Sequence, residues 1–140
     1  MSTHYATPSR IPALTAAKSL TCLRVLSLLS VLNILFQGAT AGRILMGNGG
    51  ALGLHEAGAI ALHILTGLTM IAAGQHWRSS RGAIWPTIIA AIVFIASFVQ
   101  AAFGTQQTLY VHVPLAFVLL LGATLTLAWS WFGITITTSR

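Results

Sequence analysis

Apolar residues fall into four long runs, at about residues 20–37, 54–74, 83–103 and 109–131, which are separated by more polar segments. Each run is close to the roughly twenty residues that a helix needs to cross the hydrocarbon core of a bilayer. Short connections force neighbouring helices to run antiparallel. The pattern therefore predicts an all-α membrane protein, an up-down bundle of four transmembrane helices, with the lipid bilayer as its main partner.

The segments outside the runs complete this outline. We expect residues 1–19 to form a flexible polar arm and residues 132–140 to form a short tail. Residues 38–53 are rich in glycine and contain the turn-forming sequence Gly47-Asn48-Gly49-Gly50. They predict a loop of about sixteen residues, long enough to fold over a site. No strand precedes this segment and no Gly-Lys-Ser/Thr follows it, so it is not a phosphate-binding loop.

The first run has a second interpretation, as a secretory signal. Basic residues precede its apolar stretch, and the sequence Ala39-Thr40-Ala41 that follows resembles a small-residue cleavage site. Its basic region is unusually long for a signal, and cleavage would remove a helix that the other three need as a neighbour. A transmembrane first helix is the favoured interpretation, and cleavage remains the alternative.

Composition supports a membrane protein and assigns an orientation. Of the 140 residues, 56% are hydrophobic and 6% are charged, against about 25% charged in an ordinary soluble domain. The net charge of +6 comes from seven basic residues and one acid, and the basic residues are scattered, mostly outside the apolar runs, so no nucleic-acid partner is expected. Six of the seven fall on the side of the termini and only Arg43 on the other side, which predicts cytoplasmic termini and a multi-pass protein of the cell membrane. The six are Arg10, Lys18, Arg24, Arg78, Arg81 and Arg140.

Polar side chains gather at the predicted outer ends of the helices. His55 and Glu56, the only acidic residue, begin the second run, and His112 lies near the start of the fourth. Gln37 and Gln100 lie near the ends of the first and third runs. The antiparallel topology places all five at similar depth. Because ionisable residues are costly inside a membrane, this layer is a candidate functional site.

The histidine pair suggests a haem. Two neutral imidazoles on facing helices at matched depth are what axial ligation of haem iron requires. We therefore expect one b-type haem between the second and fourth helices, with His55 and His112 as metal ligands. Arg43 would meet the haem propionates from the long loop, Glu56 would orient an imidazole or pair with Arg43, and Gln100 would lie beside the site. Such a protein would carry electrons or handle haem, with a redox or membrane-protein partner.

Three short motifs resemble sequences in a known class of proteins. They are Leu54-His55-Glu-Ala-Gly58, Val99-Gln100-x-x-Phe-Gly104 and Val111-His112-Val-Pro-Leu-Ala116. They resemble motifs of small bacterial four-helix membrane proteins of uncharacterised function that carry a histidine pair. They are also similar to one half of the haem A synthase bundle, over roughly residues 20–131.

The resemblance implies that His55 and His112 occupy the family's histidine positions, but it has departures. The family commonly has a basic residue after the first histidine and Gly after His-x-Pro-Leu, where this chain has Glu56 and Ala116. Haem A synthase also duplicates the unit and has a catalytic carboxylate before its histidine. With one unit and Glu56 after His55, the resemblance implies haem b binding or electron transfer rather than oxidation of a haem methyl group.

Other interpretations stay open. Either histidine alone fits an interfacial anchor, and His63 fits a hydrogen-bonding group within the bundle. Glu56 and His63 are seven residues apart on one helical stripe and could relay protons in a small transporter. The chain could also be an accessory subunit of a larger membrane complex. It has no Ser/His/Asp set, no paired carboxylates and a single Cys22, so no catalytic residues and no independent enzymatic activity are expected.

Overall fold

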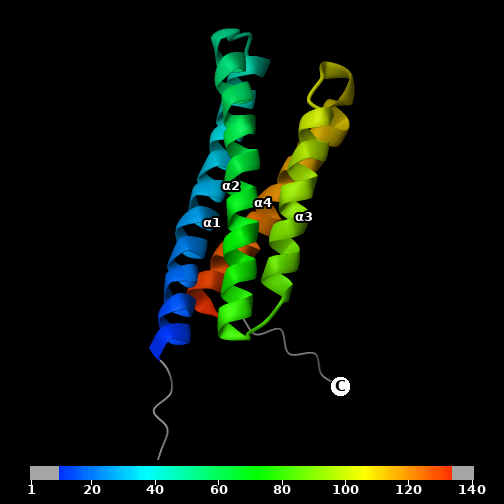
Figure 1. Ribbon diagram of the computed structural model, residues 1–140. Helices are drawn as coiled ribbons and strands as arrows, with labels where there is room; N and C mark the ends of the chain where they lie inside the picture. The colour runs from blue at the N-terminus through cyan, green and yellow to red at the C-terminus, as the bar shows by residue number, and fades with distance from the viewer. Residues whose placement is uncertain (1–9, 134–140) are drawn as a thin grey trace, which may run out of the picture.

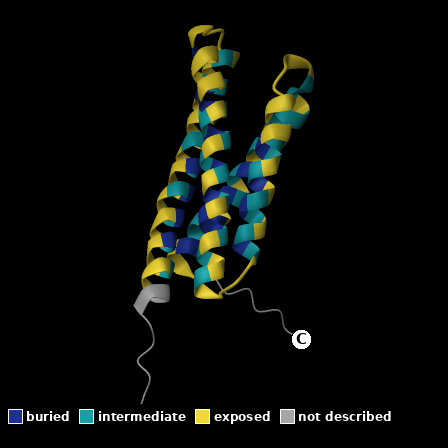
Figure 2. Ribbon diagram, in the orientation of Figure 1, coloured by how far each residue is buried: buried dark blue, intermediate teal, exposed yellow. Residues whose placement is uncertain are grey.

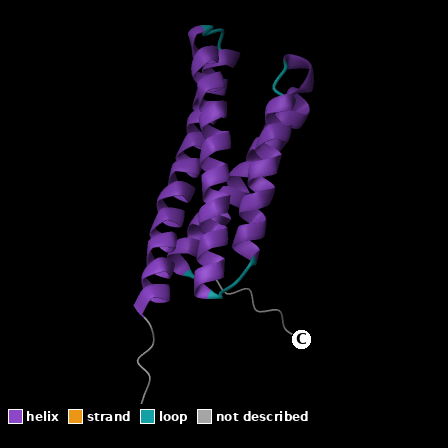
Figure 3. Cartoon of the chain, viewed as in Figure 1, coloured by secondary structure: helices purple, strands orange, loops and turns teal. Residues whose placement is uncertain are grey.

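The computed structural model describes residues 10–133, with side chains from Leu14 onward, and this part of the chain is helical apart from short connections. The order is α1 (Arg10–Leu45), α2 (Gly50–Ser80), α3 (Trp85–Ala102), a single 3₁₀ turn η1 (Gln106–Thr108) and α4 (Leu109–Phe132) (Figures 1 and 3). All four α-helices are long and apolar enough to cross a membrane. The predicted fold class, an all-α membrane protein with four transmembrane helices, is confirmed.

The helices form an up-down bundle in which each contacts two neighbours. The contacting pairs are α1–α2, α2–α3, α3–α4 and α4–α1, so α2 and α4 face each other across the bundle. The start of α1 and the end of α4 lie at one end, which we call the terminal end (Figure 1). The α1–α2 and α3–α4 connections lie at the other, which we call the hairpin end. Figure 1 shows the two helical hairpins close together at the terminal end and spread apart toward the hairpin end.

The first helix is longer than predicted at both ends. Residues 10–19 belong to α1 rather than to a flexible arm, and α1 continues to Leu45, so the predicted loop of residues 38–53 is wrong. Only residues 46–49 connect α1 to α2, with Gly47 at a φ of +81° in the turn. Glycine inside a helix costs about 1 kcal/mol relative to alanine, and the packing of α1 along α2 offsets this cost. The expectations for residues 1–9 and 134–140 lie outside the described residues.

The possible cleavage segment also lies inside this helix. Ala39, Thr40 and Ala41 are helical, and the Thr40 side chain is buried. Within this segment Thr40 faces the interior of the bundle, and Ala39 is exposed.

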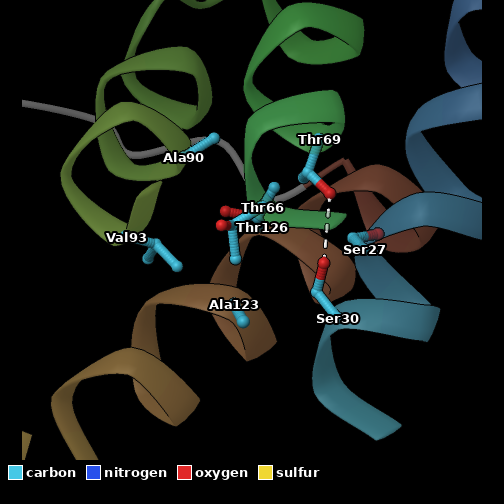
Figure 4. Close-up of a pocket in the computed structure, with 8 residues that line it drawn as sticks. All are labelled: Ser27, Ser30, Thr66, Thr69, Ala90, Val93, Ala123 and Thr126. Atoms are coloured by element: carbon cyan, nitrogen blue, oxygen red, sulfur yellow. Dashed lines mark hydrogen bonds between the residues drawn. The ribbon is translucent and has the colours of Figure 1, made fainter. Parts of the chain in front are cut away.

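Apolar side chains cover the outside of the bundle and small side chains fill much of its inside. Figure 2 shows exposed positions along the outer faces of all four helices. Leu32, Ile64 and Phe117 are among the large apolar residues exposed there, as expected for helices that contact lipid. Inside, five buried hydroxyl groups surround a cavity of about 10 Å³ toward the terminal end (Figure 4), about the volume that one water molecule needs. They belong to Ser27, Ser30, Thr66, Thr69 and Thr126.

These hydroxyl groups are satisfied mainly within their own helices. Each donates to the carbonyl four residues earlier, at 2.7 Å for Ser27 and 2.8 Å for Thr66. Between helices, Ser30 Oγ lies 3.2 Å from Thr69 Oγ1. Small polar side chains of this kind allow helices to approach closely in a membrane. They make the terminal half of the bundle the tightly packed half.

A basic side chain holds the last turn of α4. Arg24 Nε donates to the Ser130 carbonyl at 2.8 Å, and the guanidinium lies 4.9 Å from the centroid of the Trp131 ring. A cation near the carboxyl end of a helix is favourable because the carbonyls there lack helical donors. Arg24 therefore ties α1 to the end of α4.

Close packing of α3 on α4 depends on Gly122. A Cβ at this position would lie 2.5 Å from Val93 Cγ2, and the branched Val93 side chain has little freedom to move in a helix. We expect Gly122→Ala to lower the free energy of unfolding in detergent by about 1–3 kcal/mol through overpacking. Val93→Ala in the same chain should restore most of the loss. Gly53→Ala is the matched control because nothing lies within 4 Å of its added Cβ. Equal stability of the Gly122 and Gly53 variants would contradict the expectation.

Candidate functional site

His55 of α2 and His112 of α4 lie side by side near the hairpin end. Their ring centroids are 6.2 Å apart and the ring planes are inclined by 47°. Both side chains are half-buried. The backbones of α2 and α4 do not contact each other across the bundle. Near the hairpin end, the two opposite helices approach each other through these two rings.

Both ring nitrogens of His112 contact one residue, Gln100. His112 Nδ1 lies 2.8 Å from the Gln100 carbonyl oxygen, so Nδ1 carries the proton and donates it. His112 Nε2 lies 2.8 Å from the Gln100 side-chain nitrogen and accepts from it. Gln100 lies in the last turn of α3, where its carbonyl accepts from Phe103 N–H at 3.2 Å and still has a lone pair for His112. The end of α3 therefore sets the orientation of His112.

His55 is held by Thr40 of α1. Its Nδ1 lies 2.9 Å from Thr40 Oγ1, and that hydroxyl donates its proton to the Gln37 carbonyl at 3.0 Å. With the single hydroxyl proton directed to the Gln37 carbonyl, His55 Nδ1 is the donor to Thr40. His55 and His112 therefore share one tautomer, with a proton on Nδ1 and a lone pair on Nε2.

A cavity of about 390 Å³ lies beside the two rings, where the hairpins spread apart. Its polar groups, His55, His112, Gln37 and Gln100, come from all four helices, and the rest of its wall is apolar. Gly38 and Gly42 of α1 line it, and a Cβ on either would meet open space. The other lining residues are Ile34, Leu35, Ala41, Leu45, Leu62, Val113, Ala116, Phe117, Leu119 and Leu120.

The two charged residues expected at the site do not line this cavity. Arg43 is exposed in the last turn of α1, because the loop that was to carry it over the site is helical. Glu56 is also exposed, since the residue after His55 turns away from it by about 100° on a helix. Neither Glu56 nor His63 lines the cavity. A proton relay between these two residues therefore has no common site there.

The packing around α2 fills the space beside Gly58 and confirms that His63 is a hydrogen-bonding group within the bundle. The space beside Gly58 is occupied, because a Cβ there would lie 2.6 Å from Gln37 Oε1. That oxygen is buried without a hydrogen-bond partner. His63 lies apart from the pair, with Nδ1 2.9 Å from Ser97 Oγ and its ring stacked on Phe98 at 4.1 Å. Among the described residues, no three of His, Cys, Asp and Glu come together.

Sequence reasoning missed the role of Thr40. It was assigned to a loop or a cleavage site, although Ile34, Gln37, Gly38 and Ala41 have the spacing of one helical face. Extending that period beyond Gln37 would have placed Thr40 in the helix and beside the second run.

Replacing Thr40 tests this arrangement. Thr40→Val keeps the shape but removes the acceptor for His55 Nδ1–H, and an unpaired buried donor costs about 1–3 kcal/mol. We expect lower thermal stability in detergent and a shift in the tautomer balance of His55, read from ¹⁵N NMR of its ring. Thr21→Val is the control, since Thr21 is exposed on the same helix. An unchanged His55 spectrum would show that Thr40 does not hold the ring.

Comparison of the chain with models of protein families, with curated protein sequences and with solved structures finds no match.

Proposed function

We propose that this integral membrane protein binds one b-type haem, with His55 and His112 as the axial ligands. The spacing of the rings carries the proposal. Because an imidazole nitrogen binds a metal ion at about 2 Å and its ring centroid lies about 1 Å further back, two imidazoles on opposite sides of one ion have centroids about 6 Å apart. The centroids of the two rings are 6.2 Å apart, which is close to this spacing.

The protonation of the rings supports the same ligand. A metal ion needs a nitrogen lone pair, and the hydrogen bonds to Thr40 and to the Gln100 carbonyl leave that lone pair on Nε2 in both rings. Ligating histidines commonly donate their other N–H to a carbonyl or a similar acceptor, which fixes the ring and raises its basicity. The two contacts at Nδ1 therefore support ligation through Nε2.

The cavity supports a flat, mostly apolar ligand. Its volume of about 390 Å³ falls in the range of about 300–1,000 Å³ that is usual for small-molecule and cofactor sites. The absence of side chains at Gly38 and Gly42 widens it on the α1 side. The motifs around His55 and His112, similar to those in one half of the haem A synthase bundle, agree with the proposal.

The chain's own residues would position and shield the group. Thr40 and Gln100 hold the imidazoles, and the apolar wall from Ile34 to Leu120 excludes water. His55 and His112 would hold the group, which would supply one-electron transfer when bound. We infer a carrier of electrons or a haem-handling subunit that works with a membrane-protein or redox partner. A purely structural accessory role is the alternative outcome of the tests below.

Spectroscopy of the purified protein tests the ligands. With haem supplied during expression, we expect a reduced-minus-oxidised spectrum with b-type Soret and α bands. His55→Ala and His112→Ala should each lose most of the haem. His76→Ala is the control because His76 lies at the terminal end, with Nδ1 3.2 Å from the Ala16 carbonyl. A folded parent protein without these bands would refute haem binding.

Filling the cavity tests the location of the site independently of the ligands. Gly38→Phe places a ring in the open space of the cavity wall and should abolish haem binding while helical content, measured by circular dichroism, stays the same. Gly53→Phe makes the same change at an open position that does not line the cavity, so its haem content should match the parent. Equal haem content in both variants would place the ligand elsewhere.

A further inference from the structure

We propose that the Gln100 side chain is a latch on His112 Nε2, which closes the site when it is empty and has to swing away before iron can bind. This inference rests on the proposed function and deepens it. The amide nitrogen of Gln100 lies 2.8 Å from His112 Nε2. That nitrogen has one lone pair, so it cannot accept from Gln100 and bind iron at the same time.

The latch can open without disturbing the ring. Gln100 holds His112 at two points: its backbone carbonyl accepts from Nδ1–H and its side chain donates to Nε2. Rotation of the side chain breaks only the second contact, and the first keeps the tautomer. Both residues lie at the wall of the cavity, and the Gln100 side chain is only half-buried, so packing does not lock its amide in place. Opening is therefore a movement of one side chain and not of a helix.

The latch lowers the affinity of every ligand of His112 Nε2 by the same factor. A hydrogen bond inside an apolar cavity is stronger than in water, and any ligand of His112 must replace it. Haem does so while burying a large apolar surface in the cavity. A loosely bound metal ion gains only its bonds to two histidines, since no third His, Cys, Asp or Glu joins them among the described residues. The apolar wall of the cavity, and not the latch, would therefore favour haem over free metal ions.

Substitution of Gln100 by leucine removes the amide and keeps the backbone carbonyl. The haem-free protein in detergent is first studied by ¹⁵N NMR of its histidine rings. We expect His112 Nε2 to show the shift of a hydrogen-bonded acceptor in the parent and of a free lone pair in Gln100→Leu, with Nδ1 protonated in both. Haem titration should then show about fivefold tighter binding by the variant, the equivalent of one neutral hydrogen bond.

Gln37→Leu is the matched control, because Gln37 lines the same cavity and its side-chain oxygen has no hydrogen-bond partner. It should leave the His112 spectrum unchanged. Where Gln100→Leu does not fold, the parent spectrum alone still tests the latch, and Gln100→Ala replaces it in the titration.

The outcomes separate the two proposals. Haem binding with equal or lower affinity in Gln100→Leu, or a free Nε2 in the parent, overturns the latch and leaves haem binding standing. If neither the parent nor the variant binds haem, both proposals are refuted: haem binding and the Gln100 latch.

Discussion

A polar group inside a membrane-spanning bundle must find its partner within the protein, because lipid offers no hydrogen bonds. This constraint organises the structure. Hydroxyl groups in the interior donate hydrogen bonds to carbonyls of their own helices, as Thr66 does to the Leu62 carbonyl. The histidines cannot do so, and each instead uses a group on a neighbouring helix: Thr40 for His55 and Gln100 for His112. The polar contacts between helices at the hairpin end are therefore contacts to the imidazoles.

The same constraint divides the bundle into two halves. Toward the terminal end, small residues let the helices meet, and Gly122 admits Val93 so closely that even a methyl group would collide. Toward the hairpin end the hairpins spread (Figure 1), and larger polar side chains with Gly38 and Gly42 surround a cavity of about 390 Å³. The histidine pair and the cavity therefore lie in the open half, and the close packing lies in the other half.

The extension of α1 to Leu45 has the largest effect on the site. It places Thr40 against His55 and supplies the glycine wall of the cavity, and it also carries Arg43 to an exposed position. A site built on helices is more precise than one covered by a loop. Arg43 and Glu56, the charged residues that the sequence suggested for the site, do not line the cavity. Its polar groups are imidazoles and amides.

The sequence by itself determined the four membrane-spanning helices, because a run of apolar residues of the right length has few other stable states in a bilayer. It also placed His55, His112, Gln37 and Gln100 at one end, since short connections impose antiparallel neighbours. Only the tertiary structure decided which of these polar groups meet. Whether Gly38 and Gly42 end a helix or lie within one depends on packing against α2, which outweighs the local preference of glycine. The exposure of Glu56 and Arg43, and the double contact of Gln100 with His112, follow from that packing and from helix rotation, neither of which apolar periodicity specifies.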